Sequence, residues 1–162
     1  TGADATHVFK DNGQYTVTIT VTDGDGGSTS QTLDVTVNNI APSITEVDGK
    51  TTLNEGEAVN YSAVATDPGD DELTYTWNFG DGTEQSTVNS QQSTVEHTYT
   101  QNGDYRIEVT VSDEDGAATV SNLDVTVNNV APIIDTESIK TGEEGSAVTF
   151  EYMYALLLTV DC

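Results

Sequence analysis

Basic side chains are scarce in this chain of 162 residues. It has 4 lysines and arginines against 28 aspartates and glutamates, and its formal net charge is −24. Nucleic acids and anionic lipid surfaces are bound through clustered lysine and arginine, so this composition argues against both as partners. A surface of one sign also repels itself, which lowers stability unless cations bind or screen it. The charge therefore predicts divalent cations as partners.

Cysteine and long apolar runs are scarce as well. The single cysteine, Cys162, is the last residue, so no disulfide can form within the chain. The sequence shows neither a signal peptide nor an apolar run long enough to span a bilayer, so we expect no membrane insertion. Its acidic residues lie in short clusters between patterned apolar segments, which argues against disorder. A cysteine-poor, acidic, threonine-rich chain is typical of secreted or cell-surface proteins of prokaryotes.

Alternation of apolar and polar side chains runs through most of the chain. From Tyr15 to Thr22 the odd positions are apolar and the even positions are threonine, and 105–111 and 73–79 alternate in the same way. Period two with many β-branched residues is typical of half-buried strands. No segment keeps a helical period over three turns. The pattern predicts an all-β protein.

The sequence repeats with a period of 90 residues. LDVTVNNIAP at 33–42 recurs as LDVTVNNVAP at 123–132, and His7 and Tyr15 recur as His97 and Tyr105. A unit of this size is usual for a seven-stranded β-sandwich. The chain then looks like a fragment of a longer array, with a divergent or truncated tail after Phe150. The predicted domains are the C-terminal part of one repeat (1–40), a complete repeat (41–130) and the start of a third (131–162).

Several motifs in the complete repeat identify a family. YTWNFGDG at 75–82 is followed by HTY at 97–99 and by GDYRIEVTVSD at 103–113. Together they resemble the polycystic-kidney-disease (PKD) repeat, with Asn78 in place of the usual aspartate. The resemblance covers the whole repeat at 43–130, and residues 1–42 resemble the second half of a repeat. It implies immunoglobulin-like, PKD-type antiparallel β-sandwich repeats in tandem, usually in extracellular proteins.

Acidic clusters and an asparagine pair suggest a metal site. In an immunoglobulin-like sandwich the B–C loop (67–72), the F–G loop (113–116) and the linker that leads into the first strand lie at one end. Carboxylate and amide oxygens in this number suit Ca²⁺, which takes six to eight oxygen ligands. The alternative is that these acids are solvated turn residues, since Asp-Gly and Asp-Pro-Gly form turns. The predicted ligands are Asn39, Asp67, Asp71 and Asp113, with Asp70 and Asp115 as further members.

Catalysis has little support in the sequence. His7 and His97 occupy the same position of the repeat and match the HTY motif, so we expect a structural role for them. No serine, cysteine or lysine lies in a recognisable nucleophile setting. Gly80-Asp81-Gly82 reads as a tight turn that closes a hairpin. We therefore expect a protein that is not an enzyme.

Three functional hypotheses remain open. The first is a non-enzymatic extracellular spacer or adhesion repeat, rigidified by Ca²⁺ at a junction between domains. The second is an accessory, substrate-engaging module of a secreted hydrolase of the protease or chitinase type. The third is a self-assembling surface or filament subunit, because partial repeats leave strand edges and apolar faces uncovered. The expected partners are neighbouring repeats of the same chain, and other protein chains or extracellular polymers.

Overall fold

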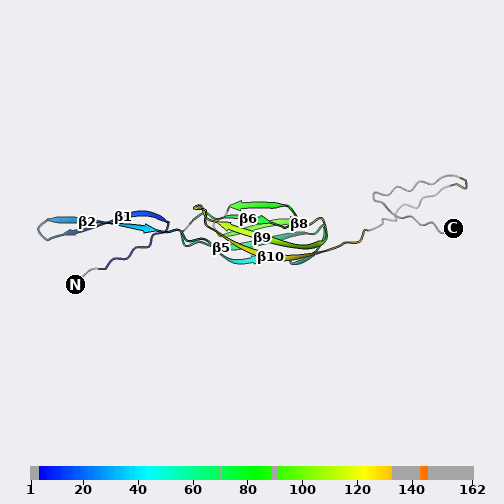
Figure 1. The fold of residues 1–162 in the computed structure, drawn as a ribbon, viewed down its shortest axis with the longest axis horizontal. Coiled ribbons are helices and arrows are strands. Elements are labelled where there is room, and N and C mark those ends of the chain that lie inside the picture. The colour runs from blue at the N-terminus through cyan, green and yellow to red at the C-terminus, as the bar shows by residue number, and fades with distance from the viewer. Residues whose placement is uncertain (1–3, 70, 89–90, 133–142, 146–162) are drawn as a thin grey trace. The chain divides into compact units, whose positions relative to one another are not determined.

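The computed structural model describes residues 4–69, 71–88, 91–132 and 143–145. The chain divides into two compact units, Thr1–Val130 and Ala131–Cys162. The regular structure of the described ranges is entirely β, as the alternation predicts, and none of their residues forms a helix long and apolar enough to cross a membrane. The strands (Figure 1) are β1 Gly13–Thr22, β2 Ser28–Val37, β3 Ser43–Asp48, β4 Thr52–Asn54, β5 Ala58–Thr66, β6 Thr74–Asn78, β7 Glu84–Val88, β8 Gln92–Thr98, β9 Gly103–Ser112 and β10 Ala118–Asn128.

Strands β1 and β2 form an antiparallel hairpin in a sheet of their own. Their register runs from Gly13 opposite Val37 to Thr22 opposite Ser28. The repeat predicts an inward face here, yet Ile19 is 56% exposed and Leu33 58% exposed. Within the described residues no second sheet packs against the hairpin, so this face is uncovered, as we expect of a partial repeat.

Strands β3 to β10 form the β-sandwich of the complete repeat. One sheet has the order β3-β5-β8 and the other has the order β4-β10-β9-β6-β7. All pairs are antiparallel except β4 with β10, which is parallel. The predicted first strand is divided between the two sheets as β3 and β4, so the sandwich has one strand more than expected. Gly49 lies at the division, where a Cβ atom would overlap the ring of Tyr61 at 2.2 Å.

The core lies between the two sheets and contains the apolar residues that the alternation places inward. Trp77 is fully buried, and its Nε1–H donates a hydrogen bond of 3.0 Å to the Ser93 hydroxyl on the opposite sheet. Burial of a tryptophan removes about 150–250 Å² of surface from water, which makes Trp77 the main anchor between the sheets. The other fully buried large side chains are Tyr61, Leu73, Tyr75, Phe79, Tyr99, Ile107, Val109, Val111 and Val125.

A tyrosine corner occurs in both copies of the repeat. The Tyr105 hydroxyl donates to the carbonyl of Gln101 at 3.0 Å, and the Tyr15 hydroxyl donates to the carbonyl of Asp11 at 2.9 Å. Such a corner fixes the loop that precedes the strand. Since Gly13 pairs with Val37, the first corner lies at the end of the hairpin where β2 passes into the linker.

Candidate metal site

The B–C loop joins β5 to β6, and a local hydrogen bond shapes it. Asp67 Oδ1 accepts the backbone N–H of Gly69 at 2.7 Å, which closes the turn of the Asp-Pro-Gly sequence. A Cβ atom at Gly69 would lie 2.8 Å from Asp71 Oδ2 and 3.0 Å from Asp67 Oδ1. The absence of a side chain at this position therefore lets the two carboxylates approach each other.

The F–G loop joins β9 to β10 and is shaped in a similar way. Asp113 Oδ1 accepts the backbone N–H of Ala117 at 2.8 Å, and the backbone N–H of Asp113 donates to the Ala117 carbonyl at 3.0 Å. Gly116 has a φ of +88°, a left-handed conformation that glycine adopts without steric cost. These contacts hold the Asp113 side chain in place, so that its second oxygen faces away from its own turn.

The two loops bring three carboxylates together. One oxygen each of Asp67, Asp71 and Asp113 lies within 4.8 Å of the others, and we call these residues the inner group. Asp71 and Asp113 are each only 6% exposed. Asp67 Oδ2 is buried and has no hydrogen-bond partner among the described residues. Buried polar atoms are almost always paired, so an unpaired carboxylate oxygen in this position points to a missing ligand.

The linker between hairpin and sandwich closes this end of the domain. The amide Nδ2 of Asn39 donates to Asp113 Oδ2 at 2.8 Å. The Thr119 hydroxyl on β10 donates to the carbonyl of Pro42 at 2.6 Å, and Pro42 is buried. In this geometry Asn39 anchors the linker to the F–G loop through its nitrogen, while its predicted role as an oxygen ligand stays a prediction.

The pKa values of two carboxyl groups in the inner group, Asp71 and Asp113, are shifted in opposite directions. Burial, and after it the nearby charges of Asp67, Asp11 and Asp115, together raise the pKa of Asp71 to about 6. Burial also raises the pKa of Asp113, but hydrogen bonds from the Asn39 side chain and from backbone amides outweigh it and leave the pKa lowered. Asp113 is thus supported as an anion, whereas Asp71 has only like charges beside it.

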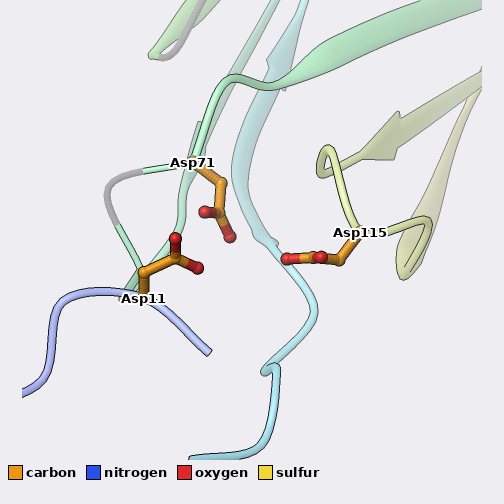
Figure 2. A group of neighbouring side chains, drawn as sticks. All are labelled: Asp11, Asp71 and Asp115. Atoms are coloured by element: carbon orange, nitrogen blue, oxygen red, sulfur yellow. The ribbon is translucent and has the colours of Figure 1, made fainter. Parts of the chain in front are cut away.

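A second set of carboxylates meets beside the first. Figure 2 shows Asp11, Asp71 and Asp115 with their carboxylates turned toward one another, each from a different segment of the chain. One oxygen of each lies within 4.8 Å of the others, and we call these residues the outer group. Asp71 belongs to both groups. Asp11 and Asp115 are exposed, so only Asp71 is removed from water there.

The structure brings together most of the residues that the sequence singles out. Asp67, Asp71 and Asp113 form the inner group with Asn39 against it, and Asp115 lies in the outer group. Asp70 lies outside the described residues. Asp11 is the residue that the sequence analysis missed. The tyrosine corner could have pointed to it. The 90-residue period aligns Asp11 with Gln101, and in each copy the tyrosine hydroxyl donates to the carbonyl of this residue.

The donor chemistry fits a hard cation. The two groups offer five carboxylates at one end of the domain, and Ca²⁺ prefers carboxylate and carbonyl oxygens at about 2.3–2.6 Å. No histidine or cysteine belongs to either group, which makes the donor set unlike that of a zinc site. These residues could hold Ca²⁺ between the two loops.

The pair formed by His97 and Asp81 is structural. His97 Nε2 lies 2.9 Å from Asp81 Oδ2, and the His97 ring stacks on Phe79 with a centroid distance of 3.9 Å. Asp81 also accepts the backbone N–H of Thr83 at 3.0 Å, as expected for a tight turn after β6. His97 is therefore held by packing and by one carboxylate, and it ties β8 to the turn between β6 and β7.

The chain is similar to a known domain family and to several solved structures. A family profile described as the PKD domain matches residues 1–37 and 39–127. A PKD domain of an M14-like peptidase from a Thermoplasmatales archaeon is 29% identical, with a TM-score of 0.51, over 56% of this chain and 98% of that one. The PKD1 domain of Vibrio anguillarum Epp is 26% identical, with a TM-score of 0.46, over 57% and 100%. The PKD domain of the human receptor SorCS2 is 21% identical, with a TM-score of 0.42, over 58% and 77%.

Proposed function

Because this chain belongs to the PKD domain family, we propose that it is a non-enzymatic spacer or adhesion repeat of a prokaryotic secreted or cell-surface protein, stiffened by Ca²⁺ at the junction between repeats. The predicted PKD resemblance and the immunoglobulin-like β-sandwich are both confirmed. PKD domains are in general non-catalytic modules of extracellular proteins. The Ca²⁺ site, the adhesive role, the tandem arrangement and the prokaryotic origin belong to the proposal.

The inner group is the observation that carries the proposal. Three carboxylates from two loops lie within 4.8 Å of one another, two of them almost fully buried. Like charges at such distances repel strongly where water is excluded. When bound, Ca²⁺ would neutralise this charge and tie the two loops to each other. Asp67 Oδ2, which has no partner among the described residues, is the oxygen best placed to gain one.

The contacts of the linker explain how a loop site would stiffen a junction. Asn39 is bonded to Asp113 of the F–G loop, so a cation that fixes Asp113 also fixes the linker. At the other end of the sandwich the backbone N–H of Val130 donates to Glu55 Oε1 at 2.8 Å. The chain is therefore attached to the sandwich where it enters and where it leaves, which suits a spacer of defined geometry.

Thermal unfolding with and without Ca²⁺ tests the proposal. Trp77 is the only tryptophan and is fully buried, so its fluorescence reports the unfolding of the sandwich. A ligand at 100 times its Kd stabilises the folded state by about 2.7 kcal/mol, and 1 kcal/mol shifts the Tm of a domain of this size by about 4–8 °C. We expect CaCl₂ to raise the Tm by about 10 °C or more over the value in EDTA.

Two variants make the test specific. Asp67→Asn keeps the oxygen that accepts from Gly69 but removes the charge, and we expect it to abolish the Ca²⁺-dependent rise. Asp124→Asn is the matched control, because the Asp124 side chain is 82% exposed and, among the described residues, makes only a 3.9 Å contact with Arg106. An unchanged Tm in wild-type protein, or an equal rise in the Asp67→Asn variant, would refute the Ca²⁺ site.

The accessory-module hypothesis has one observation in its favour, since a similar solved structure is the PKD domain of an M14-like peptidase. Engagement of a polymer by stacking needs exposed aromatic side chains. Among the described residues, the exposed large apolar side chains are all valine, leucine or isoleucine, and Tyr75 and Trp77 are fully buried. Pull-down on insoluble collagen, chitin or cellulose tests this role, and retention by any of them would favour it over the spacer.

A further inference from the structure

The outer group contains a residue from outside the sandwich. Asp11 precedes β1 and belongs to the partial repeat, while Asp71 and Asp115 belong to the B–C and F–G loops of the complete repeat. Figure 2 shows that the carboxylate of Asp71 points into the space between the other two. An acidic side chain from one repeat therefore meets the acidic loops of the next.

Asp71 differs from an ordinary surface acid because it is buried. It is only 6% exposed, its carboxylate accepts no hydrogen bond within the described part of the chain, and the charges found to act on it are those of other acids. A carboxylate removed from water without a partner is costly to keep ionised. Asp71 belongs to both groups, so its carboxylate is placed to contact a cation in each of them, as bridging carboxylates do.

The backbone of Asp11 is held independently of any ligand. The Tyr15 hydroxyl donates to the carbonyls of Asp11 at 2.9 Å and Asn12 at 3.2 Å. This corner lies beside the end of β2, and β2 leads through the linker into β3. Chain topology thus puts the corner of one repeat at the same junction as the B–C and F–G loops of the next. A side chain fixed there is preorganised to reach them.

Charge balance indicates more than one cation. The inner and outer groups together hold five carboxylates, of Asp11, Asp67, Asp71, Asp113 and Asp115. A single Ca²⁺ in the inner group neutralises two of these charges and leaves the outer pair facing each other beside Asp71. Glu114 adds to the negative potential at the same place, since its charge also acts on Asp71. A second divalent cation would relieve this repulsion.

We propose that Asp11, Asp71 and Asp115 bind a second Ca²⁺, which joins the preceding repeat directly to the sandwich and shares Asp71 with the first. The inference rests on the proposed Ca²⁺ site of the inner group and extends it across the junction. In this arrangement the inner cation orders the loops of one domain, and the outer cation ties two domains together. Asp11 is the residue that decides whether the second cation binds.

Calcium binding to the full chain tests the second site. Equilibrium dialysis with radioactive Ca²⁺ should show that Asp11→Asn binds one Ca²⁺ fewer than wild type, or binds it at least ten-fold more weakly. Asp34→Asn is the matched control, because it removes the same charge from the same partial repeat and keeps the oxygen that accepts from Thr16. An Asp11→Asn variant that binds the same number of ions as Asp34→Asn, with affinities within two-fold, would overturn the second site.

The outcome separates this inference from the function on which it rests. Loss of an ion in Asp67→Asn but not in Asp11→Asn refutes only the second site. No binding in wild type refutes both sites. A second measurement reports on the connection between the hairpin and the sandwich. Cys162→Ser removes the native cysteine, and Thr18→Cys and Ser86→Cys place one spin label on each part. We expect the distribution of distances between the two labels to narrow when CaCl₂ is added. Persistence of the narrowing in Asp11→Asn would also count against the second site.

Discussion

Two buried tyrosines differ by one hydrogen bond, and this difference predicts that the same substitution costs stability at one position and not at the other. Tyr75 and Tyr99 are both fully buried. The Tyr99 hydroxyl donates to the carbonyl of Phe79 at 3.0 Å, whereas the Tyr75 hydroxyl makes no hydrogen bond of ordinary geometry among the described residues. Its polar neighbour is the backbone N–H of Ala65, which donates to the Gln91 carbonyl at 3.2 Å. Tyr99→Phe removes a bond and leaves the Phe79 carbonyl with one donor fewer, which costs about 1–3 kcal/mol. Tyr75→Phe removes a polar group that is already unpaired.

The expected Tm changes follow from these free energies. For a domain of about 90 residues, 1 kcal/mol corresponds to about 4–8 °C, so a cost of about 1–3 kcal/mol should lower the Tm of Tyr99→Phe by about 4–24 °C. Tyr75→Phe should leave the free energy of unfolding within about 0.5 kcal/mol or raise it. Urea titration followed by Trp77 fluorescence measures the free energy of unfolding of each variant, and thermal melting in the same buffer measures its Tm. Equal losses in the two variants would refute the reasoning, since they would mean that the hydroxyls contribute equally.

Two further predictions concern the junction and the turn after β6. Because burial and the nearby charges of Asp67 and other acids raise the pKa of Asp71 from 3.8 to about 6, the folded state retains a proton that the unfolded state loses between these values. In EDTA, the free energy of unfolding should therefore fall as pH rises through this range, and Asp71→Asn should remove the part of the fall that Asp71 causes. Melting scans from pH 4 to 7 measure this. A Tm that falls as far in the variant as in wild type would contradict the prediction. Gly80 and Gly82 have φ of +77° and +91°, but only a Cβ atom at Gly80 would meet backbone, the Arg106 carbonyl at 2.8 Å. Gly80→Ala should thus cost at least about 1 kcal/mol more than Gly82→Ala in urea titrations, and similar costs would contradict the close approach.

Much of the fold follows from the sequence because its signals are local. Alternation at 73–79 places Trp77 on the buried face, and that face is fully buried in the structure. Immunoglobulin-like topology then determines which loops share an end, so Asp67 and Asp113 could be paired across 46 positions. Both steps use the order of the strands along the chain and need no knowledge of side-chain packing.

Other features depend on contacts that no pattern records. The first strand of the sandwich divides near Gly49 because it exchanges one sheet for the other, yet in the sequence Gly49 looks like an ordinary turn residue. The burial of Asp71 results from packing of the B–C loop, and neither composition nor periodicity predicts that packing. The tyrosine corner marks the position of Asp11 in the preceding repeat, but no pattern in the sequence relates that position to Asp71 and Asp115 of the complete repeat.

The parallel pair of β4 and β10 determines how the sandwich would carry a mechanical load. The chain enters beside β3 at the end where Ser43 pairs with Thr66, and it leaves from β10 at the opposite end, where Val127 pairs with Gly103. Tension between the two linkers therefore acts along the strands. The bonds between β4 and β10, including Thr126 N–H to the Thr51 carbonyl at 2.8 Å, lie across this direction. They are strained together in shear, whereas bonds at the end of a hairpin open one after another.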